Sequence, residues 1–231
     1  MANVRELLGR LNQQTIRYDV GRGGIPELSN QDIAAALAFV EPGLGRELLE
    51  ACWWPDGAAL RRKQLRDAVI ALVQPELRRQ WQLLADARTE LGIAKACMGW
   101  GGAVTPEQQR ELERATARLE RVTAECWPRT TLESLPTLAQ AVIREIAHRS
   151  LCGDCGGRGQ LVAGELVVTC ATCGGHGVVP MSDRKRAAAI GRDEAAYRRN
   201  WRGVYEWLLV RMRNAESAAA AQLRRALDRA A

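Results

Sequence analysis

The sequence predicts a mainly α-helical protein, a helical bundle that contains a helix-turn-helix and an inserted small β-hairpin. Three observations support this prediction: apolar residues recur at helical spacing, glycine and proline gather at a few sharp connections, and two cysteine-rich motifs flank a short β-prone stretch. With 231 residues, of which 47% are hydrophobic, the chain can form one large or two modest domains. We predict a helical region over 1–131 and a second region over 132–231.

The first hundred residues are predicted to form several short helices. Ser29 and Asn30 are typical caps for an apolar run that stops before Pro42. The next helix, Leu44–Trp54, ends at a Pro-Asp-Gly turn, and apolar residues then follow helical spacing over 58–73. The glycine-rich segment at 17–25 has the spacing of neither a P-loop nor a Rossmann turn, and we predict a loop there.

Residues from about 75 to 126 are predicted to form a long helical hairpin. Pro75 opens a helix that runs to about Cys97, and a glycine-rich segment then interrupts it. Thr105 caps the second helix, which has proline in its first turn and runs to about Cys126. Glu and Arg recur at helical pair spacing in both helices. We expect this hairpin to serve as a scaffold or a protein-contact arm.

Two copies of the motif CxxCxGxG follow a helix that is predicted from about Leu135 to Arg149. Four thiolates in two pairs form a closed tetrahedral ligand set for zinc, with no open position for a substrate or a water molecule. Residues 161–168, between the pairs, are typical of two short strands around a turn. Disulfides from the same cysteines would require an oxidising compartment. We therefore predict a zinc ribbon inserted at 151–179, with one structural Zn²⁺ held by Cys152, Cys155, Cys170 and Cys173.

The segment after the ribbon has the helix cap and the turn residue that are typical of a helix-turn-helix. Ser182 would cap a short helix to Ile190, Gly191 would form the turn, and a long helix would start at Asp193. We expect that helix to reach about Asn214 or, through the Ala-rich end of the chain, almost the last residue. Its apolar face would consist of Tyr197, Trp201, Val204, Tyr205, Leu208 and Met212. The opposite face carries arginines, as the recognition helix of a DNA-binding domain does.

Basic charge is concentrated in this segment. The whole chain has a net charge of +6, and 182–213 alone carries +5 of it. A positive patch beside a zinc ribbon is the electrostatic footprint of a nucleic-acid binder, although a solvated helix face would give the same pattern. The sequence does not separate contacts to phosphates from contacts to bases. The candidate DNA contacts are Arg184, Lys185, Arg192, Arg198, Arg199 and Arg202.

The cysteine knuckles, together with the basic segment at 186–201, resemble the late-gene antitermination protein Q of lambdoid bacteriophages. The resemblance covers about 135 to 213, roughly a third of the chain. Its CxxCxGxG repeats also occur in J-domain co-chaperones, so the distinctive part is the basic helix-turn-helix directly after them. The resemblance implies a factor that binds double-stranded DNA near a phage late promoter. It also implies that the factor engages paused bacterial RNA polymerase holoenzyme, which then reads through terminators.

Two other functions remain open. A promoter-binding regulator that acts only at initiation would use the same helix. A zinc-dependent protein-interaction module would use the same knuckles, but J-proteins carry four knuckles and a His-Pro-Asp tripeptide, and this chain has two knuckles and no such tripeptide. Only two histidines, His148 and His176, are present, without a catalytic motif, so we do not expect an enzyme.

The remaining features concern location and the other cysteines. No apolar stretch approaches the roughly 18 residues of a membrane span, and no secretory signal is apparent, so we predict a cytoplasmic protein without a membrane partner. The oligomeric state is not predicted. Three isolated cysteines are expected to behave as small buried hydrophobes: Cys52, Cys97 and Cys126.

Overall fold

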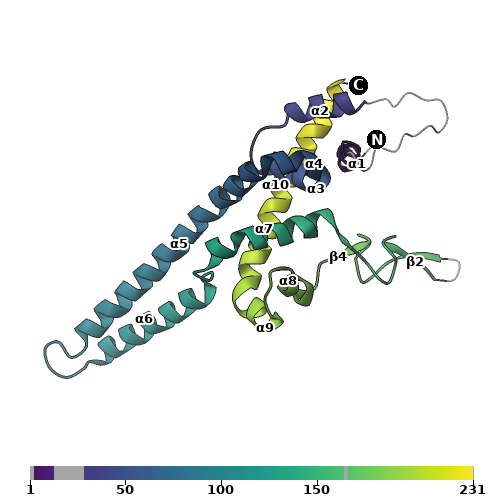
Figure 1. Ribbon diagram of the computed structural model, residues 1–231. Helices are drawn as coiled ribbons and strands as arrows, with labels where there is room; N and C mark the ends of the chain where they lie inside the picture. Colours follow the sequence, from purple (N-terminus) through teal and green to yellow (C-terminus); the bar gives the residue numbers. More distant parts are fainter. Residues whose placement is uncertain (1–2, 13–28, 164–165, 231) are drawn as a thin grey trace. The chain divides into compact units, whose positions relative to one another are not determined.

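The computed structural model describes residues 3–12, 29–163 and 166–230, and most of this described chain is α-helical, as predicted (Figure 1). The predicted loop at 17–25 lies outside the described residues. The chain divides into two compact units: unit 1 combines Met1–Val69 with Glu133–Ala231, and unit 2 is Ile70–Leu132. The N-terminal segment up to Val69 therefore groups with the C-terminal part of the chain. The predicted boundary at 131 had instead placed it in one region with the hairpin. None of the described helices has the length and apolar content needed to cross a membrane.

Unit 2 is an antiparallel helical hairpin made from most of α5 (Arg62–Cys97) and from α6 (Pro106–Glu125). Gln108 donates to the carbonyl of Cys97 near the tip at 2.8 Å, and the backbone amide of Trp127 donates to the side chain of Gln80 at 2.9 Å at the other end. Thr105 forms the predicted cap of α6, in a complete capping box with Gln108. The two helices lie side by side (Figure 1).

The predicted break at Pro75 is wrong. Helix α5 continues from Arg62 to Cys97 with Pro75 inside it. An interior proline removes one helical hydrogen bond and costs about 3 kcal/mol. Buried apolar residues on both sides of it, Val73 and Leu77, stabilise the helix by more than this loss, so a local breaker does not end it.

In unit 1, three short N-terminal helices pack against the C-terminal half of α10 (Arg202–Ala230). They are α1 (Val4–Gly9), α2 (Asn30–Ala38) and α3 (Leu44–Trp53). Ser29 caps α2 as predicted, in a capping box with Asp32. Their shared core contains Leu8, Ile33 and Leu223, all fully buried.

The predicted turn after α3 is helical instead. Pro55 occupies the first turn of a short helix, α4 (Pro55–Ala58), which leads through a 3₁₀ turn, η2 (Ala59–Arg61), directly into α5. Proline is well suited to this first helical position because the amide that it lacks has no partner there. The proline therefore starts a helix at a position where the sequence predicted only a turn.

The C-terminal part of unit 1 contains α7 (Thr131–Ala147), α8 (Asp183–Ala189) and α9 (Glu194–Ala196). A π-helical turn, η3 (Tyr197–Trp201), joins α9 to α10. Gly191 lies in the left-handed region with φ of 66°, at the predicted turn. The predicted apolar face of the long helix is confirmed, since all six of its residues are buried: Tyr197, Trp201, Val204, Tyr205, Leu208 and Met212.

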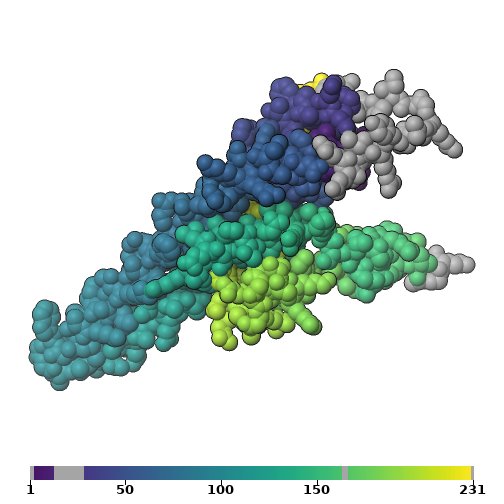
Figure 2. Space-filling model, viewed as in Figure 1, coloured from purple at the N-terminus to yellow at the C-terminus, as the bar shows by residue number. Residues whose placement is uncertain are grey.

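Four short strands lie between α7 and α8. Strands β2 (Gln160–Ala163) and β3 (Leu166–Thr169) form the predicted antiparallel hairpin. Strands β1 (Ser150–Leu151) and β4 (Val178–Val179) also pair antiparallel, with Ser150 opposite Val179, which the sequence did not predict. We call 150–179 the ribbon; in the space-filling view its green residues form a lobe that stands out from the helices of unit 1 (Figure 2).

Candidate metal centre

The four predicted metal ligands converge inside the ribbon. All four thiols are buried, and their Sγ atoms lie within 4.8 Å of one another. The Sγ atoms of Cys152 and Cys170 are 3.8 Å apart, and those of Cys155 and Cys173 are 3.7 Å apart. A tetrahedral ion with metal–sulfur bonds of about 2.3 Å, as in zinc thiolates, holds its sulfurs about 3.8 Å apart. The site therefore has the size that a single tetrahedral metal ion needs.

The two knuckles hold each other through a reciprocal set of backbone hydrogen bonds. The amide of Cys152 donates to the carbonyl of Gly177, and the amide of Cys170 donates to the carbonyl of Gly159, each at 2.9 Å. Asp154 and Thr172, which occupy the same place in the two motifs, are also hydrogen-bonded to each other. The two copies of the motif are therefore related by a local twofold arrangement around the four sulfurs.

The last glycine of each motif cannot be replaced without strain. Gly159 and Gly177 have φ of 75° and 71°, in the region that side-chain-bearing residues rarely adopt. A Cβ atom at Gly159 would overlap the carbonyl oxygen of Gly175, and one at Gly177 would overlap that of Gly157. The glycine at the end of each motif thus reflects the close approach of the two knuckles.

The backbone also stabilises the thiolate form of the ligands. The amides of Gly159 and Gly177 donate to the sulfurs of Cys155 and Cys173, each at 3.2 Å. Burial opposes ionisation of Cys155, but the Gly159 amide and the neighbouring thiols outweigh burial and lower its pKa to about 7. Burial without such donors raises the pKa of Cys52 to about 12, as suits an inert core thiol. The backbone of the ribbon therefore favours the ionised sulfur that a metal binds.

Four sulfur ligands leave no coordination position for a substrate, so the centre suits a structural role. The apolar cluster of the ribbon consists of the four cysteines, with Val179 packed against them. The described side chains of β2 and β3 are largely exposed, and Val162 and Leu166 are 73% and 70% accessible. A fold with so little apolar burial depends on a metal or an equivalent cross-link.

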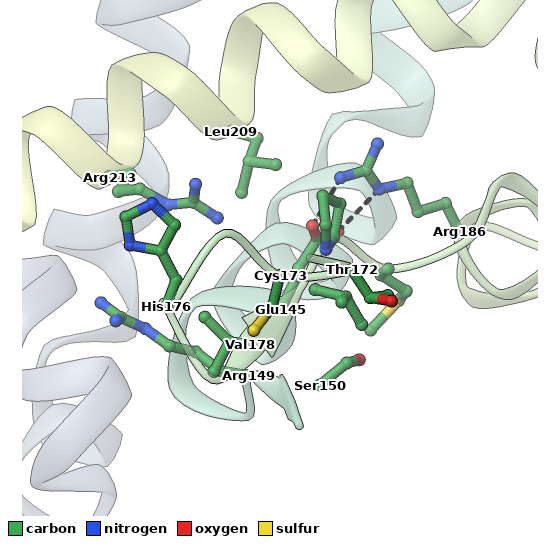
Figure 3. A pocket seen from close by; sticks show the side chains of 13 residues that line it. Glu145, Arg149, Ser150, Thr172, Cys173, His176, Val178, Arg186, Leu209 and Arg213 are labelled. Atoms are coloured by element: carbon green, nitrogen blue, oxygen red, sulfur yellow. Dashed lines mark hydrogen bonds and ion pairs between the residues drawn. The ribbon is translucent and has the colours of Figure 1, made fainter. Parts of the chain in front are cut away.

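An open cavity of about 500 Å³ lies beside the second knuckle (Figure 3). It is bounded by the end of α7, by β4 and by α10. Arg149, His176 and Arg213 lie on one side of it, and the paired side chains of Glu145 and Arg186 lie on the other. The sequence did not predict this cavity, because residues from three distant segments form it.

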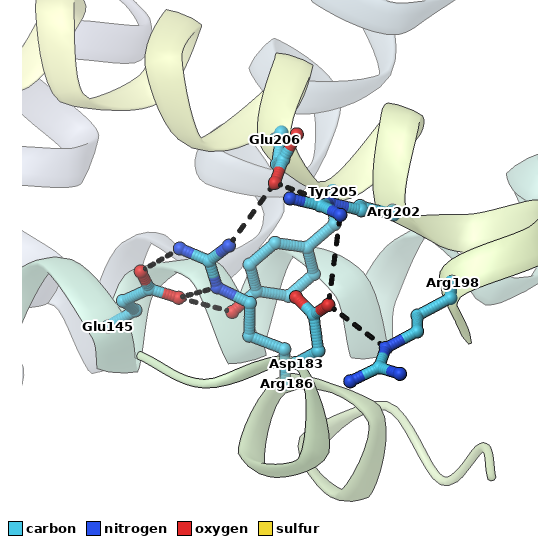
Figure 4. A network of polar contacts seen from close by, with 7 residues as sticks. All are labelled: Glu145, Asp183, Arg186, Arg198, Arg202, Tyr205 and Glu206. Atoms are coloured by element: carbon cyan, nitrogen blue, oxygen red, sulfur yellow. Dashed lines mark hydrogen bonds and ion pairs between the residues drawn. The ribbon is translucent and has the colours of Figure 1, made fainter. Parts of the chain in front are cut away.

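A buried polar network connects three helices of unit 1 (Figure 4). Arg186 of α8 donates two hydrogen bonds to Glu145 of α7, at 2.9 and 2.6 Å, and the hydroxyl of Tyr205 in α10 donates to the same carboxylate at 3.0 Å. Burial would lower the pKa of Arg186, but the hydrogen bonds and charge of Glu145 raise it above its ordinary value. Arg186 is thus a buried structural residue, although it lies within the basic segment.

The six candidate DNA contacts are exposed, and the structure gives them different surroundings. Arg198 pairs with Asp183 and Glu194, and Arg202 pairs with Asp183 and Glu206. The guanidinium of Arg192 lies 5.1 Å from the centre of the Trp201 ring. The other three have no ion pair among the described residues: Arg184, Lys185 and Arg199. The candidate set is therefore an exposed surface of mixed charge, rather than a purely basic one.

Comparisons of the chain with protein-family models, with curated proteins and with solved structures give no significant match.

Proposed function

We propose that the ribbon binds one structural Zn²⁺ and that the protein is a DNA-binding transcription factor. The observation that carries the zinc part is the convergence of four buried thiols, whose Sγ atoms lie within 4.8 Å of one another. The hydrogen bonds of Glu145 with Arg186 and Tyr205 hold α8 against α7 and α10, and the exposed basic residues at the amino-terminal end of the long helix support the DNA-binding part. Zinc suits the centre because it prefers four thiolates in a tetrahedron. The ion would supply folding energy to the ribbon and no chemistry.

The DNA-binding element in this proposal is a helix-turn-helix formed by α8, the turn at Gly191, and the helix that starts at Glu194. Ser182 and Asp193 cap the two helices, and both helices bury one face in unit 1. Arg198, Arg199 and Arg202 lie on the exposed side of the second helix. The ion pairs that Arg198 and Arg202 form with Asp183, Glu194 and Glu206 are mostly exposed, and exposed pairs contribute little to stability. Phosphates could therefore replace the acidic partners at small cost.

Within that class, we propose an antitermination factor that acts in the bacterial cytoplasm. This step depends on the resemblance of residues 135 to 213 to late-gene antitermination protein Q of lambdoid bacteriophages. The factor would bind DNA near a late promoter, engage paused RNA polymerase holoenzyme, and allow it to read through terminators. The zinc ribbon, which lies between α7 and α8 in the chain, would then be directly next to the DNA-binding helices.

Single-round transcription with purified bacterial polymerase tests the proposal. The template carries a phage late promoter with its own upstream DNA and a downstream terminator. We expect greater readthrough when the protein is added, and loss of the effect when the promoter-proximal DNA is replaced. A change in initiation without a change in readthrough would instead identify a promoter-binding regulator.

A protein-interaction module is the second candidate, and the exposed apolar side chains of β2 and β3 favour it. Val162, Leu166 and Val167 are each more than 60% accessible on a hairpin of only eight described residues. Exposed apolar side chains that lie close together are typical of protein contacts. Absence of both DNA binding and any effect on transcription would make this candidate the leading one.

A further inference from the structure

We infer that the cavity beside the second knuckle is an anion site that binds a phosphate group, with a DNA backbone phosphate as its natural occupant. That the phosphate belongs to DNA rests on the proposed function, whereas the preference of the site for an anion rests on the cavity itself. We call Arg149, His176 and Arg213 the basic cluster. None of these three residues belongs to the predicted DNA-contact set.

The basic cluster is brought together by three elements of unit 1. Arg149 follows α7, His176 lies in the second knuckle, and Arg213 lies on α10. All three side chains are exposed and line the same cavity, and Figure 3 shows them together on one side of it. This convergence depends on the fold, because His176 comes 27 positions after Arg149 in the chain and Arg213 comes 37 positions after His176.

The charge of the cluster is not compensated within the described chain. Neither Arg149 nor Arg213 has an ion pair there, and Glu145 is the acidic residue that lines the cavity. The carboxylate of Glu145 already accepts hydrogen bonds from Arg186 and Tyr205, at 2.6 to 3.0 Å. It therefore cannot neutralise the cluster as well. Two guanidinium groups in one cavity without an acidic partner repel each other, and a bound anion would relieve this repulsion.

The chemistry of the lining favours phosphate among anions. Arginine presents paired N–H donors that match two oxygens of a phosphate group, and two arginines can bind one phosphate from two sides. Apolar residues, including Val178 and Leu209, form another part of the lining and would contact a sugar ring. A cavity of about 500 Å³ that is open to solvent can admit one nucleotide unit of a longer chain.

The contrast with the predicted recognition surface strengthens this inference. Arg198 and Arg202 have acidic partners within 4 Å, so a phosphate that binds them must displace those carboxylates. A phosphate that binds Arg149 and Arg213 displaces only water and ions. In addition, Arg149 lies next to β1, whose pairing with β4 fixes the base of the ribbon, and Arg213 follows the buried Met212. The backbone positions of both arginines are therefore fixed before any ligand binds.

The test measures binding of the full-length, zinc-loaded protein to a fluorescent DNA duplex over a series of KCl concentrations. The variant R149Q/R213Q should bind about tenfold more weakly at low salt. Its plot of log affinity against log salt should be shallower by about 0.9 for each phosphate that the variant no longer neutralises. The matched control is R224Q/R225Q, which removes two exposed arginines from α10, the helix that carries Arg213, without touching the cavity. The control should keep the slope of the wild type.

Two further measurements separate failure of this inference from failure of the proposed function. If R149Q/R213Q keeps the wild-type slope while R199A/R202A loses affinity, DNA binding stands and the cavity site is overturned. If the wild type binds no duplex, titration with inorganic phosphate is followed through the NMR signals of the arginine Nε–H groups. Shifts of the Arg149 and Arg213 signals, which are assigned by their loss in R149Q/R213Q, would support an anion site with another source of phosphate, and absence of these shifts would overturn the site. Zinc content and circular dichroism should be unchanged in all three double variants.

Discussion

The ribbon and the helical part of unit 1 reach a folded state by opposite means. Among its described residues, the ribbon buries four cysteines and little else, and the side chains of β2 and β3 that the structure describes remain exposed. The helical part buries apolar residues from α1, α2, α3 and α10 in one continuous cluster. Apolar burial stabilises the second region without any ligand, whereas the first depends on what its cysteines bind. The two regions should therefore respond independently to changes in metal, packing and pH.

Removal of the metal should give the largest effect, and only in the ribbon. Cys155→Ser or a strong chelator removes a binding energy of about 10–16 kcal/mol, which is also the folding energy of a structural zinc site. We expect loss of one bound zinc per chain and of amide protection in 150–179. Helical circular dichroism should persist, because the helical core makes no use of the metal. Unfolding of the helices on chelation would show that the two regions are not independent.

Disruption of the buried ion pair should give the next largest effect, and only in the helical part. Glu145→Gln removes the buried counter-charge of Arg186, whose side chain is 7% exposed, and leaves it only the more exposed carboxylate of Glu206 at 3.6 Å. Loss of one partner from a buried pair costs about 3–5 kcal/mol in the free energy of unfolding. Urea denaturation, followed by the helical signal in far-ultraviolet circular dichroism, measures this loss. The zinc content should stay at one ion per chain.

The exposed pair between Arg198 and Glu194 provides the control for that experiment. Glu194→Gln should leave the urea midpoint almost unchanged, since exposed ion pairs contribute little. If both variants lower the midpoint equally, the network of Glu145 would have no special role in the helical part.

Gly177→Ala should weaken the metal centre without destroying it. The substitution forces a positive φ on alanine, at about 1–2 kcal/mol, and pushes a Cβ atom against the carbonyl of Gly157. We expect zinc affinity, measured by competition with a chromogenic chelator, to fall at least about tenfold. Gly153→Ala is the control, because a Cβ atom at Gly153 meets no neighbour. Equal affinities for the two variants would contradict the close approach of the knuckles.

Mild acid should give the smallest effect on the helical part. Glu216 is buried, which by itself would raise its pKa, but hydrogen bonds from Arg5 and Trp53 outweigh burial and lower it below 4.5. Because the pKa of this carboxyl is lower in the folded than in the unfolded state, its ionised form stabilises the fold fully above about pH 4.5. This contribution disappears as pH falls through the folded-state pKa. Thermal unfolding between neutral pH and acid should show this decline, and Glu216→Gln should make it less steep. An equal decline in the variant would assign the pH dependence to other groups.

The sequence predicted the elements that depend on neighbouring residues. Ser29, Thr105 and Ser182 mark helix starts because their side chains cap amides within the same turn. The cysteine set was predictable because its spacing is part of the motif. The extent of α5 through Pro75 was not, because packing overrides a local breaker.

Features formed by distant segments could not be predicted in the same way. Glu145 and Arg186 are 41 residues apart, and neither has a local signal that distinguishes it from a surface charge. The pairing of β1 with β4 involves two residues on each side, too few for a periodic pattern. The cavity beside the second knuckle depends on all of these placements at once, so only the folded chain brings its arginines together.

The pairing of Ser150 with Val179 has a consequence for how the protein can vary. The chain leaves the helical part and returns to it at adjacent points, so the whole ribbon is an insertion between α7 and α8. Insertions or deletions at the hairpin tip change neither of these two points. Natural variants should therefore differ in length between β2 and β3 more readily than at any position between the cysteines of a knuckle, and a domain of choice could be grafted there without disturbing the helices.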